Sequence, residues 1–434
     1  MRWVIAMLFA ASCGAACAHA EAPRVEVVKT PDGYRLMRGG EPYFVKGAGG
    51  SDQLDLLAST GANSIRTWGT NDLEPRRWPD GAFESVLDRA HARGLTVCAG
   101  FWMKHTRHGF DYDDDDAVER QIEEAVAWVN KWKHHPAILM WGVGNEVSLD
   151  GSHEQVFPEI DRLAAAIKEA DPSRPTMTAL AGIWPNQGAQ FARLCPNIDI
   201  LGLNAYGGLA PASHAMLSQG YTGPFIVTEF GPFGHWECGL SQWGAPVEQS
   251  SAGKARAYRE SYQMTVLDQP HRCLGAYAFL WGHKQEVTYS WFGMLLPTGE
   301  KLEQVDTMTE LWSGRPPSNR CPRVEGLESD AALRRVAPGT SWTVRALATE
   351  PDSDPMTYRW SVFAETTDRR TGGDAETVPP QIEGRVAGGG EQITLTTPLT
   401  PGPYRLYVEV VDDQRAAGTA NMPFYVAANG ARPD

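Results

Sequence analysis

The sequence predicts an α/β protein in which a (β/α)₈ barrel is followed by a smaller all-β, immunoglobulin-like sandwich. Between about residues 43 and 282, eight short apolar runs of strand length alternate with helical stretches. Beyond a Pro- and Arg-rich stretch at 313–323, the pattern changes to runs in which apolar and polar residues alternate. A (β/α)₈ barrel needs eight strand–helix units in roughly 250 residues. Alternation with period two is typical of strands that bury one face.

The eight apolar runs are the predicted barrel strands. They read YFVKGAGG, ANSIRTWG, LTVCAGFWM, ILMWGVGNE, PTMTALAGIW, DILGLNAYGG, FIVTEFGPFG and LGAYAFLWG. Two of the intervening stretches carry apolar residues at the spacing of one helix face: Phe83, Val86, Leu87 and Ala90, and Ile160, Leu163, Ala164 and Ile167. A doubly wound sheet is the alternative, but it predicts fewer strands and a GxGxxG loop, which KGAGGSD lacks.

The predicted domain boundaries follow these changes of pattern. Residues 1–20 are assigned to a signal peptide, 21–312 to the barrel, 313–323 to a linker and 324–434 to the sandwich. The predicted sandwich strands are SWTVRALA, MTYRWSVFAE, EQITLTTP, YRLYVEVVDD and MPFYVA. A sandwich of about 100 residues is immunoglobulin-like in size. We expect a spacer or accessory role for it.

The N-terminus, MRWVIAMLFAASCGAACAHA, has the pattern of a secretory signal peptide. Arg2 precedes an apolar core, and the small residues of AHA end it. We expect cleavage after Ala20 and a secreted or periplasmic protein. Lipoprotein anchoring through Cys13 is the less favoured alternative, because AAS before it matches the usual Leu-containing box poorly. No other segment approaches the roughly 18 apolar residues that span a bilayer.

The net charge limits the class of partner, and the cysteine content limits the possible disulfides. A formal net charge of −14 argues against a nucleic-acid partner, because phosphate binding needs a basic surface. Five cysteines follow the predicted signal peptide, and Cys98, inside an apolar run, is expected to be a buried free thiol. The other four could form up to two disulfides in an oxidising compartment: Cys195, Cys238, Cys273 and Cys321. The sequence is silent on oligomeric state.

Acidic clusters raise the question of calcium, whose preferred ligands are carboxylates. The run from Asp111 to Asp116 is better explained as a solvated helix start. Glu350, Asp352 and Asp354, with Asp412 and Asp413 on a later strand, resemble the calcium sites of cadherin-like domains. Neither cluster is assigned a metal, and no cofactor is expected.

Barrel enzymes place their reactive groups at the carboxyl ends of the strands. The residues at or just beyond the ends of the predicted strands are therefore the candidates for a site: Arg66, His105, Asn145, Glu146, Asn204, Tyr206, Glu229 and Trp281. Fifteen Trp is a high number for this length. Aromatic side chains can serve as platforms for sugars as well as fill a core.

Glu146 and Glu229, at opposite strand ends, are the pair that cleavage of a glycosidic bond requires. One carboxyl must be protonated to release the leaving oxygen, and the other must be ionised to attack the anomeric carbon. Glu229 would stay charged if Arg66 and the Tyr206 hydroxyl donate to it. Glu146 needs a raised pKa to hold its proton. Asn145 can bond a sugar 2-hydroxyl.

The motifs that carry these residues resemble a known group. HPAILMWGVGNE, DPSRP and FIVTEFG resemble the barrels of glycoside hydrolase family 2, in clan A, and GNEV with KG near the first strand is similar to bacterial and fungal glucanosyltransferases. The resemblance covers roughly residues 40 to 315. The β-domains that normally precede a family 2 barrel are not found, so we do not expect an exo-acting galactosidase or glucuronidase.

The resemblance implies roles residue by residue. In clan A the acid/base Glu follows an Asn at the end of the fourth strand, and the nucleophile ends the seventh. Glu146 is thus implied as acid/base, Glu229 as nucleophile, and Asn145 as the contact of the 2-hydroxyl.

The remaining residues have implied or expected supporting roles. Arg66 and Tyr206 are implied as supports of the nucleophile, and Trp281 as the platform under the sugar nearest the cleaved bond. Asn204 is expected to contact substrate. His105 lies in a loop near the predicted mouth, as do His108 and His283, and is expected to bind sugar hydroxyls.

These residues together predict a retaining β-glycosidase that acts on a neutral β-linked glucan or mannan by double displacement, without a metal or organic cofactor. A transglycosylase with the same site is a close alternative, in which a sugar hydroxyl replaces water as the acceptor. A barrel that only binds polysaccharide is the competing class, and the presence of both Glu146 and Glu229 argues against it.

Overall fold

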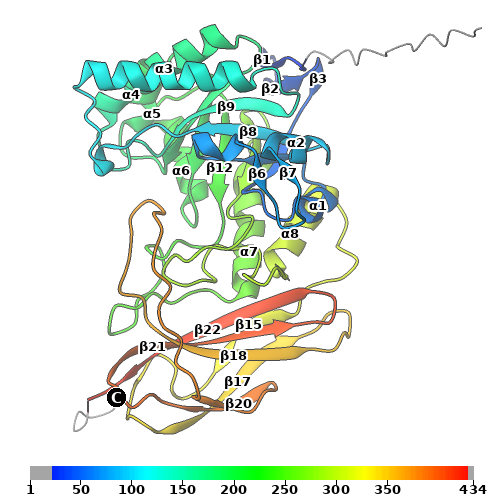
Figure 1. Cartoon of the computed structure of the whole chain (residues 1–434), viewed down its shortest axis with the longest axis vertical. Coiled ribbons are helices and arrows are strands. Elements are labelled where there is room, and N and C mark those ends of the chain that lie inside the picture. Colours follow the sequence, from blue (N-terminus) through cyan, green and yellow to red (C-terminus); the bar gives the residue numbers. More distant parts are fainter. Residues whose placement is uncertain (1–21, 429–434) are drawn as a thin grey trace, which may run out of the picture.

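The eight predicted barrel strands are present and close into a parallel barrel (Figure 1). In this computed structural model, which describes residues 22–428, the strands follow the barrel order β10-β11-β12-β13-β4-β5-β8-β9. Their bounds are β4 (Val45–Gly49), β5 (Ser64–Arg66), β8 (Thr96–Phe101), β9 (Ile138–Asn145), β10 (Thr176–Ala181), β11 (Ile200–Asn204), β12 (Phe225–Phe230) and β13 (Cys273–Ala278). The predicted (β/α)₈ barrel is confirmed.

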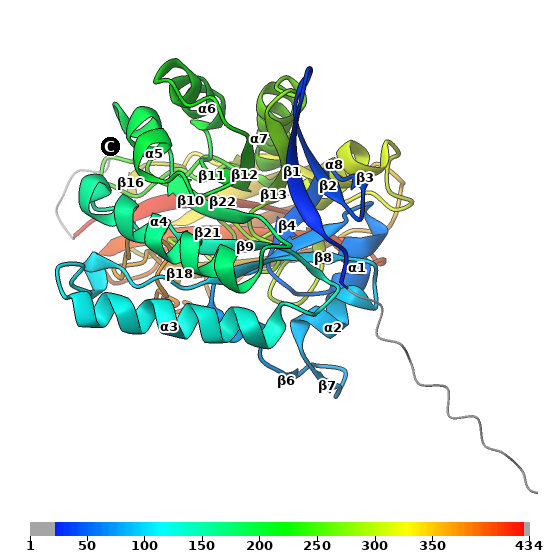
Figure 2. The ribbon, with the colours of Figure 1, turned by 90° about the horizontal axis from the view of Figure 1, so that it is seen from above.

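Helices surround these strands in a ring when the molecule is seen along the barrel (Figure 2). They are α1 (Leu54–Ser59), α2 (Val86–His91), α3 (Asp115–Trp132), α4 (His153–Ala170), α5 (Gln187–Leu194), α6 (Leu209–Ser218), α7 (Ser251–Ser261) and α8 (Glu303–Ser313). Shorter helical turns are η1 (Thr70–Leu73), η2 (Thr106–His108) and η3 (Tyr262–Leu267).

The two predicted helix faces have different outcomes. All four apolar positions assigned to α4 are buried: Ile160, Leu163, Ala164 and Ile167. Phe83 is not part of α2, so this part of the prediction is wrong. It is 69% exposed in β7 (Phe83–Glu84), which pairs with β6 (Arg76–Arg77). The helix begins only after Ser85, whose hydroxyl accepts from the Asp88 backbone N–H at 3.0 Å and so caps it.

The acidic run before α3 is a helix start, as predicted. The Asp114 carboxylate accepts a hydrogen bond of 3.0 Å from the backbone N–H of Ala117. Asp115 and Asp116 occupy the first turn, where negative charge interacts favourably with the helix dipole.

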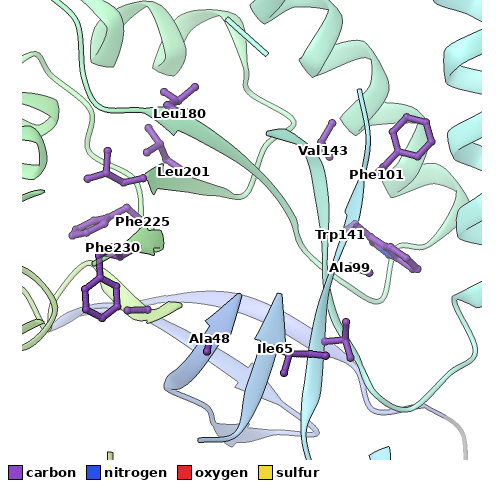
Figure 3. Packing of buried hydrophobic residues seen from close by; sticks show 14 of the residues in the cluster. Ala48, Ile65, Ala99, Phe101, Trp141, Val143, Leu180, Leu201, Phe225 and Phe230 are labelled. Atoms are coloured by element: carbon purple, nitrogen blue, oxygen red, sulfur yellow. The ribbon is translucent and has the colours of Figure 1, made fainter. Parts of the chain in front are cut away.

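The outer faces of the strands hold the helices in place. Trp141 of β9 and Phe101 of β8 point away from the barrel axis in Figure 3. Both rings contact Trp128 of α3, with centroids 5.2 and 5.8 Å apart. The Trp141 indole N–H also donates to Asp171 at 2.9 Å, so the one polar atom of this buried ring is satisfied.

A three-stranded antiparallel sheet that the sequence did not predict lies at one end of the barrel (Figure 2). Val25 donates its backbone N–H to Ser173 before β10, and Tyr34 donates to His271 before β13, each at 2.8 Å. These partners precede their strands, so the sheet covers the amino ends of the strands. Its strands are β1 (Val25–Thr30), β2 (Gly33–Arg38) and β3 (Glu41–Pro42).

The C-terminal part contains two largely antiparallel sheets, consistent with a β-sandwich, and includes all five predicted strands; only the short β14 and β16 pair parallel to their neighbour β22. One sheet has the order β14-β22-β21-β18, with β16 paired to β22, and the other β15-β17-β20-β19. The bounds are β14 (Lys301–Leu302), β15 (Arg323–Glu328), β16 (Arg335–Val336), β17 (Ser341–Thr349), β18 (Thr357–Ala364), β19 (Val386–Ala387), β20 (Gln392–Thr396), β21 (Gly402–Val411) and β22 (Ala416–Val426). The immunoglobulin-like type stays a prediction.

The state of the cysteines agrees with one expectation and differs from another. Cys98 is a buried free thiol, as predicted. The possible disulfides are not formed: the other four described cysteines, which lie on separate elements, are also free thiols. The predicted signal peptide, with Cys13, lies outside the described residues. Within residues 22–428, none of the helices combines the length and the apolar character needed to cross a bilayer.

A buried polar network joins the sandwich to the barrel. Arg405 of β21 is 1% exposed and donates to Glu365 at 2.8 Å and to the backbone carbonyl of Pro246, also at 2.8 Å. Its third contact, at 2.7 Å, is to Asn421. Pro246 belongs to the loop that follows β12. A strand of the sandwich is therefore held on a loop at the carboxyl end of a barrel strand.

The same network continues into the barrel through a second buried ion pair. The Asn421 amide donates to Glu248 at 2.5 Å, and Glu248 also accepts from Lys254 of α7 at 2.5 Å. The Thr288 and Ser290 hydroxyls donate to the same carboxylate at 2.7 and 2.9 Å. A buried charge is costly unless it is paired and hydrogen-bonded, so these contacts hold the two parts in one arrangement.

We predict that Arg405→Ala lowers the free energy of unfolding by about 3–5 kcal/mol, because it leaves the buried Glu365 carboxylate without its partner. Urea unfolding followed by circular dichroism measures this. The matched control is Arg345→Ala, which removes a surface ion pair with Glu391 in the same part of the chain. It should leave the unfolding midpoint nearly unchanged. Equal midpoints for the two variants would contradict the prediction.

Candidate active site

A β-bulge at the end of β9 explains how an apolar strand ends in a carboxylate. Between Gly142 and Asn145, β9 contains one residue more than its neighbour β10. Gly144, inside the bulge, has φ of 75°, which glycine adopts at little cost. Glu146 follows with φ of 51°, an unusual value for a residue with a Cβ. Bulges of this kind redirect side chains near functional sites.

A second bulge precedes the other carboxylate. On β12 the register with β11 gains one residue between Val227 and Glu229, so that Glu229 lies opposite Asn204. Asn204 in turn contacts Glu146, as described below. The two bulges therefore bring the ends of β9, β11 and β12 to one place at the barrel mouth.

Both carboxyl groups line one cavity of about 980 Å³. Asn145, Asn204 and the ends of several barrel strands contribute to its wall. The cavity is also lined by six aromatic side chains: Trp68, Trp102, Trp184, Tyr206, Trp236 and Phe279. Trp184 and Trp236 are 53% and 59% exposed, which makes them the accessible indoles of the rim.

Glu229 is surrounded by donors. Its Oε1 accepts from Arg66 Nη1 and from the Trp68 indole N–H, both at 2.8 Å. Its Oε2 accepts from the Tyr206 hydroxyl at 2.9 Å. The Arg66 and Glu229 side chains are only 3% and 7% exposed. Three donors, one of them a buried guanidinium, suit a carboxylate in its ionised form.

The amides of Asn145 and Asn204 connect the two carboxyl groups. Arg66 Nη2 donates to Asn145 Oδ1 at 2.6 Å, and Asn204 Nδ2 donates to the same oxygen at 3.0 Å. Asn204 Nδ2 also donates to Glu146 Oε1 at 2.8 Å. The Asn145 oxygen is thus taken by protein donors, which leaves its amide nitrogen as the group that can contact a sugar hydroxyl.

Glu146 lies in surroundings that favour its protonated form. Burial, and then the negative charge of Glu229, raise the pKa of the Glu146 carboxyl to about 7. The hydrogen bond from Asn204 and the charge of Arg66 act in the opposite direction without cancelling the effect. The Glu146 carboxyl therefore still carries its proton in a large share of the molecules at neutral pH.

Two residues whose hydrogen bonds hold this arrangement were not predicted from the sequence. Trp68 stands two positions after Arg66, so both side chains leave the extended chain on one face and reach Glu229. This spacing was a usable signal. Thr228 donates its hydroxyl to Asn204 Oδ1 at 2.6 Å and so orients the amide. No sequence pattern indicates that contact.

The prediction of Trp281 as a sugar platform is wrong. Its ring is 1% exposed, lies in the hydrophobic core and donates its indole N–H to the backbone carbonyl of Asp52 at 2.6 Å. Phe279, two residues earlier, lines the cavity instead. Its ring makes edge contacts with Trp68 and Tyr206, with centroids 5.9 and 5.8 Å apart.

His105 does not line the cavity either, which corrects its predicted contact with substrate. It is 1% exposed and stacks on Trp102, which does line the cavity, with centroids 5.0 Å apart. Burial lowers the pKa of the His105 imidazole to about 4, so the ring is neutral when it supports Trp102. His283 is exposed and is not part of the cavity wall, whereas His108 contacts Asp374 at 3.0 Å.

The acidic cluster of the sandwich is only partly assembled. Carboxylate oxygens of Glu350, Asp354 and Asp412 lie within 4.8 Å of one another. Asp352 instead forms an ion pair of 2.6 Å with Arg320. None of these residues lines the cavity that holds the Glu pair.

Comparison with known proteins relates the barrel to a family. Residues 51–250 match the model of the TIM barrel domain of glycosyl hydrolases family 2. This part of the chain is therefore similar to the glycosyl hydrolase family 2 barrel. The match agrees with the resemblance noted in the sequence and with the predicted class of enzyme, a glycoside hydrolase.

The individual relatives of this chain are distant. A β-glucuronidase of Pongo abelii is 24% identical over 256 residues, which cover 54% of this chain and 36% of that protein. Mannan endo-1,4-β-mannosidase F of Aspergillus clavatus is 22% identical, with 44% and 58% covered. A solved β-D-glucuronidase of Dictyoglomus thermophilum is 19% identical, with a TM-score of 0.49 and with 68% and 54% covered. The chain thus spans about a third of the length of the β-glucuronidase relative.

We predict that kcat/KM for a substrate with a poor leaving group falls as the pH rises through about 7, because the Glu146 carboxyl loses the proton that the leaving oxygen needs. Initial rates between pH 5 and 9 measure the profile. A 2,4-dinitrophenyl glycoside, whose leaving group needs no proton, is the control and should keep its rate above pH 7. Identical alkaline limbs for the two substrates would rule out Glu146 as the acid.

Proposed function

We propose that this protein is a retaining β-glycosidase that cleaves a neutral β-linked oligosaccharide or polysaccharide, a glucan or mannan, by double displacement. Glu229 attacks the anomeric carbon while Glu146 protonates the oxygen of the departing sugar. The bond from the anomeric carbon to that oxygen breaks as a bond to Glu229 forms. Water, deprotonated by Glu146, then attacks the same carbon and releases Glu229.

The observation that carries the proposal is the unequal environment of two carboxyl groups in one cavity. Glu229 accepts three hydrogen bonds, one of them from the buried guanidinium of Arg66, whereas Glu146 accepts a single one from Asn204. Retaining glycosidases need this division between an ionised nucleophile and a protonated acid. The two bulges that present these side chains, and the family of the barrel, support the same reaction.

Asn145 supports the proposal through its position. It precedes the proposed acid/base and directs its amide nitrogen away from two protein donors that occupy its oxygen. A hydrogen bond from this group to the sugar 2-hydroxyl would strengthen as charge develops at the anomeric carbon.

The charges of the cavity wall favour a neutral sugar. Two long basic side chains line it, and each is paired with an acid: Lys284 with Glu286 at 2.7 Å and Arg370 with Asp368 at 2.6 Å. Glu237, Glu286 and Asp374 also line the wall, so a negatively charged sugar would meet more acidic than basic side chains. The relatives include β-glucuronidases and a mannan endo-β-mannosidase, and this excess of acids leads us to prefer the neutral substrate of the latter kind.

Transfer to a sugar acceptor is a second candidate for the same site. Trp184 and Trp236 present exposed indoles at the rim of the cavity, where they could stack on an acceptor sugar. An acceptor held there would compete with water for the glycosyl-enzyme intermediate. Products longer than the substrate would reveal this reaction.

We also propose that the mature chain is exported, on the basis of the signal peptide pattern at residues 1–20. A polysaccharide substrate outside the cytoplasm would agree with this location. Fractionation of cells expressing the full chain, with N-terminal sequencing of the product, tests the cleavage after Ala20.

We predict that azide rescues the two carboxylate variants with opposite stereochemistry. With an activated β-glycoside, Glu146→Ala should accumulate the glycosyl-enzyme, and its turnover should fall about 10²–10⁴-fold. Added azide should then yield a β-glycosyl azide, because it attacks the covalent intermediate. In Glu229→Ala, azide takes the place of the nucleophile and should yield the α-azide. NMR of the product distinguishes the two anomers.

The control for this experiment is Glu123→Ala, an exposed residue of α3, which should behave as the wild type. The panel of activated glycosides should include β-glucoside, β-mannoside and β-glucuronide. An α-azide from Glu146→Ala would reverse the assigned roles. A clear preference for the glucuronide would overturn the neutral substrate but not the reaction.

A further inference from the structure

A long loop of the sandwich leaves its own domain and reaches the barrel. We define the sandwich strap as residues 365–380, between β18 and β19. Its two ends are paired, because Phe363 bridges to Gln381 and Ala364 donates its backbone N–H to Pro380 at 3.1 Å. Figure 1 shows the strap in orange, extending from the sandwich sheets up to the barrel.

The tip of the strap is part of the cavity wall. Residues 370–374, from Arg370 to Asp374, line the same cavity as Glu146 and Glu229. The cavity is therefore built from both domains. A sugar bound next to the Glu pair would meet a wall that the barrel itself does not supply.

Contacts with two separate barrel loops hold the tip in place. Asp374 pairs with Arg107 at 3.3 Å and with His108 at 3.0 Å, in the loop that follows β8. Glu376 accepts from the backbone N–H of Val287 at 2.7 Å, in the loop that follows β13. In the barrel, β4 and β5 lie between β13 and β8. The strap thus connects two loops on either side of β4 and β5 at the mouth.

Two glycines allow the tip to lie directly on the barrel loops. A Cβ at Gly372 would lie 2.4 Å from Arg107 Nη1, and one at Gly373 would lie 2.8 Å from Lys284 Nζ. Both residues have left-handed backbone, with φ of 67° and 74°. A side chain at either position would be strained and crowded.

Ion pairs and hydrogen bonds also hold the first residues of the strap in place. Its first residue, Glu365, is the buried partner of Arg405 in the network that joins the domains. Within the strap, Asp368 accepts from the backbone N–H and the hydroxyl of Thr377 at 3.0 and 2.9 Å. Fixed walls contribute more to affinity than loops that must first become ordered.

Arg370 is oriented so that part of its guanidinium remains available to a ligand. Its Nε is paired with Asp368 at 2.6 Å, and its backbone N–H donates to Glu376 at 3.0 Å. The side chain is 56% exposed and lines the cavity. With Nε engaged, the two terminal nitrogens are the donors that can meet sugar oxygens.

We propose that the sandwich strap is a specificity-determining wall of the sugar site, in which Arg370 donates hydrogen bonds to hydroxyl oxygens of the bound sugar and Asp374 positions the tip. The proposal rests on the proposed function, which makes this cavity a sugar site. It assigns the C-terminal domain a direct part in substrate recognition in place of the spacer role expected from the sequence.

Binding can be measured without turnover in the Glu229→Gln background. The fluorescence of the cavity tryptophans reports titration with β-1,4-linked glucan and mannan tetrasaccharides. Adding Arg370→Ala should weaken binding about tenfold, since it removes charged hydrogen bonds to the ligand. Adding Asp374→Ala should weaken binding in the same direction.

In the otherwise wild-type enzyme, both substitutions should raise KM for the tetrasaccharide with little change in kcat, because the Glu pair is untouched. The matched control is Glu383→Ala, an exposed acid just beyond the strap that does not line the cavity. It should match the wild type in both assays. Thermal unfolding of each variant should show an unchanged midpoint, which separates loss of contact from loss of fold.

Different results would contradict the proposed reaction and the proposed role of the strap. Turnover by the wild type with equal binding and equal KM for Arg370→Ala, Asp374→Ala and Glu383→Ala would overturn the role of the strap alone. Strap-dependent binding without turnover of any β-glycoside would overturn the proposed reaction alone. Absence of binding by every sugar tested would overturn both.

Discussion

The charge of Arg66 is the constraint on which the candidate site depends. Its guanidinium is buried at the end of β5, and a charge there is tolerated only with an ionised partner and full hydrogen bonding. Glu229 supplies the partner, and Asn145 and the backbone carbonyl of Thr228 accept further hydrogen bonds from the guanidinium. Because Asn145 is held in this way, Asn204 can connect it to Glu146. One buried cation thereby sets the positions of both carboxyl groups.

The same electrostatics separates their chemistry. Burial, and then the charge of Glu229, make ionisation of Glu146 unfavourable by raising its pKa, and Arg66 forms its ion pair with Glu229. The bulges in β9 and β12 are the backbone feature that brings the groups this close. The close approach of the two carboxyl groups at the barrel mouth thus depends on the bulges at the ends of two strands.

Much of this site was predictable from residue order. Eight apolar runs predicted eight strands, and the residues at their ends included both Glu, both Asn, Arg66 and Tyr206. Prediction failed where either of two nearby aromatic residues could have lined the cavity. Trp281 and Phe279 both follow β13, and only packing decides that the Phe ring faces the cavity while the Trp ring enters the core. The sheet β1 to β3 was missed because its short strands lack a strong apolar pattern.

The sequence by itself determined the barrel, the sandwich and the pair of carboxylates, because period, strand length and strand-end residues are local properties of the chain. Tertiary structure decided which groups meet. Arg66 pairs with Glu229, which is 163 positions away in the sequence, and Asp374 of the sandwich pairs with Arg107, which is 267 positions away. Contacts between segments so far apart depend on how two domains dock, and docking depends on buried partners such as Arg405 and Glu365, whose pairing no local pattern records.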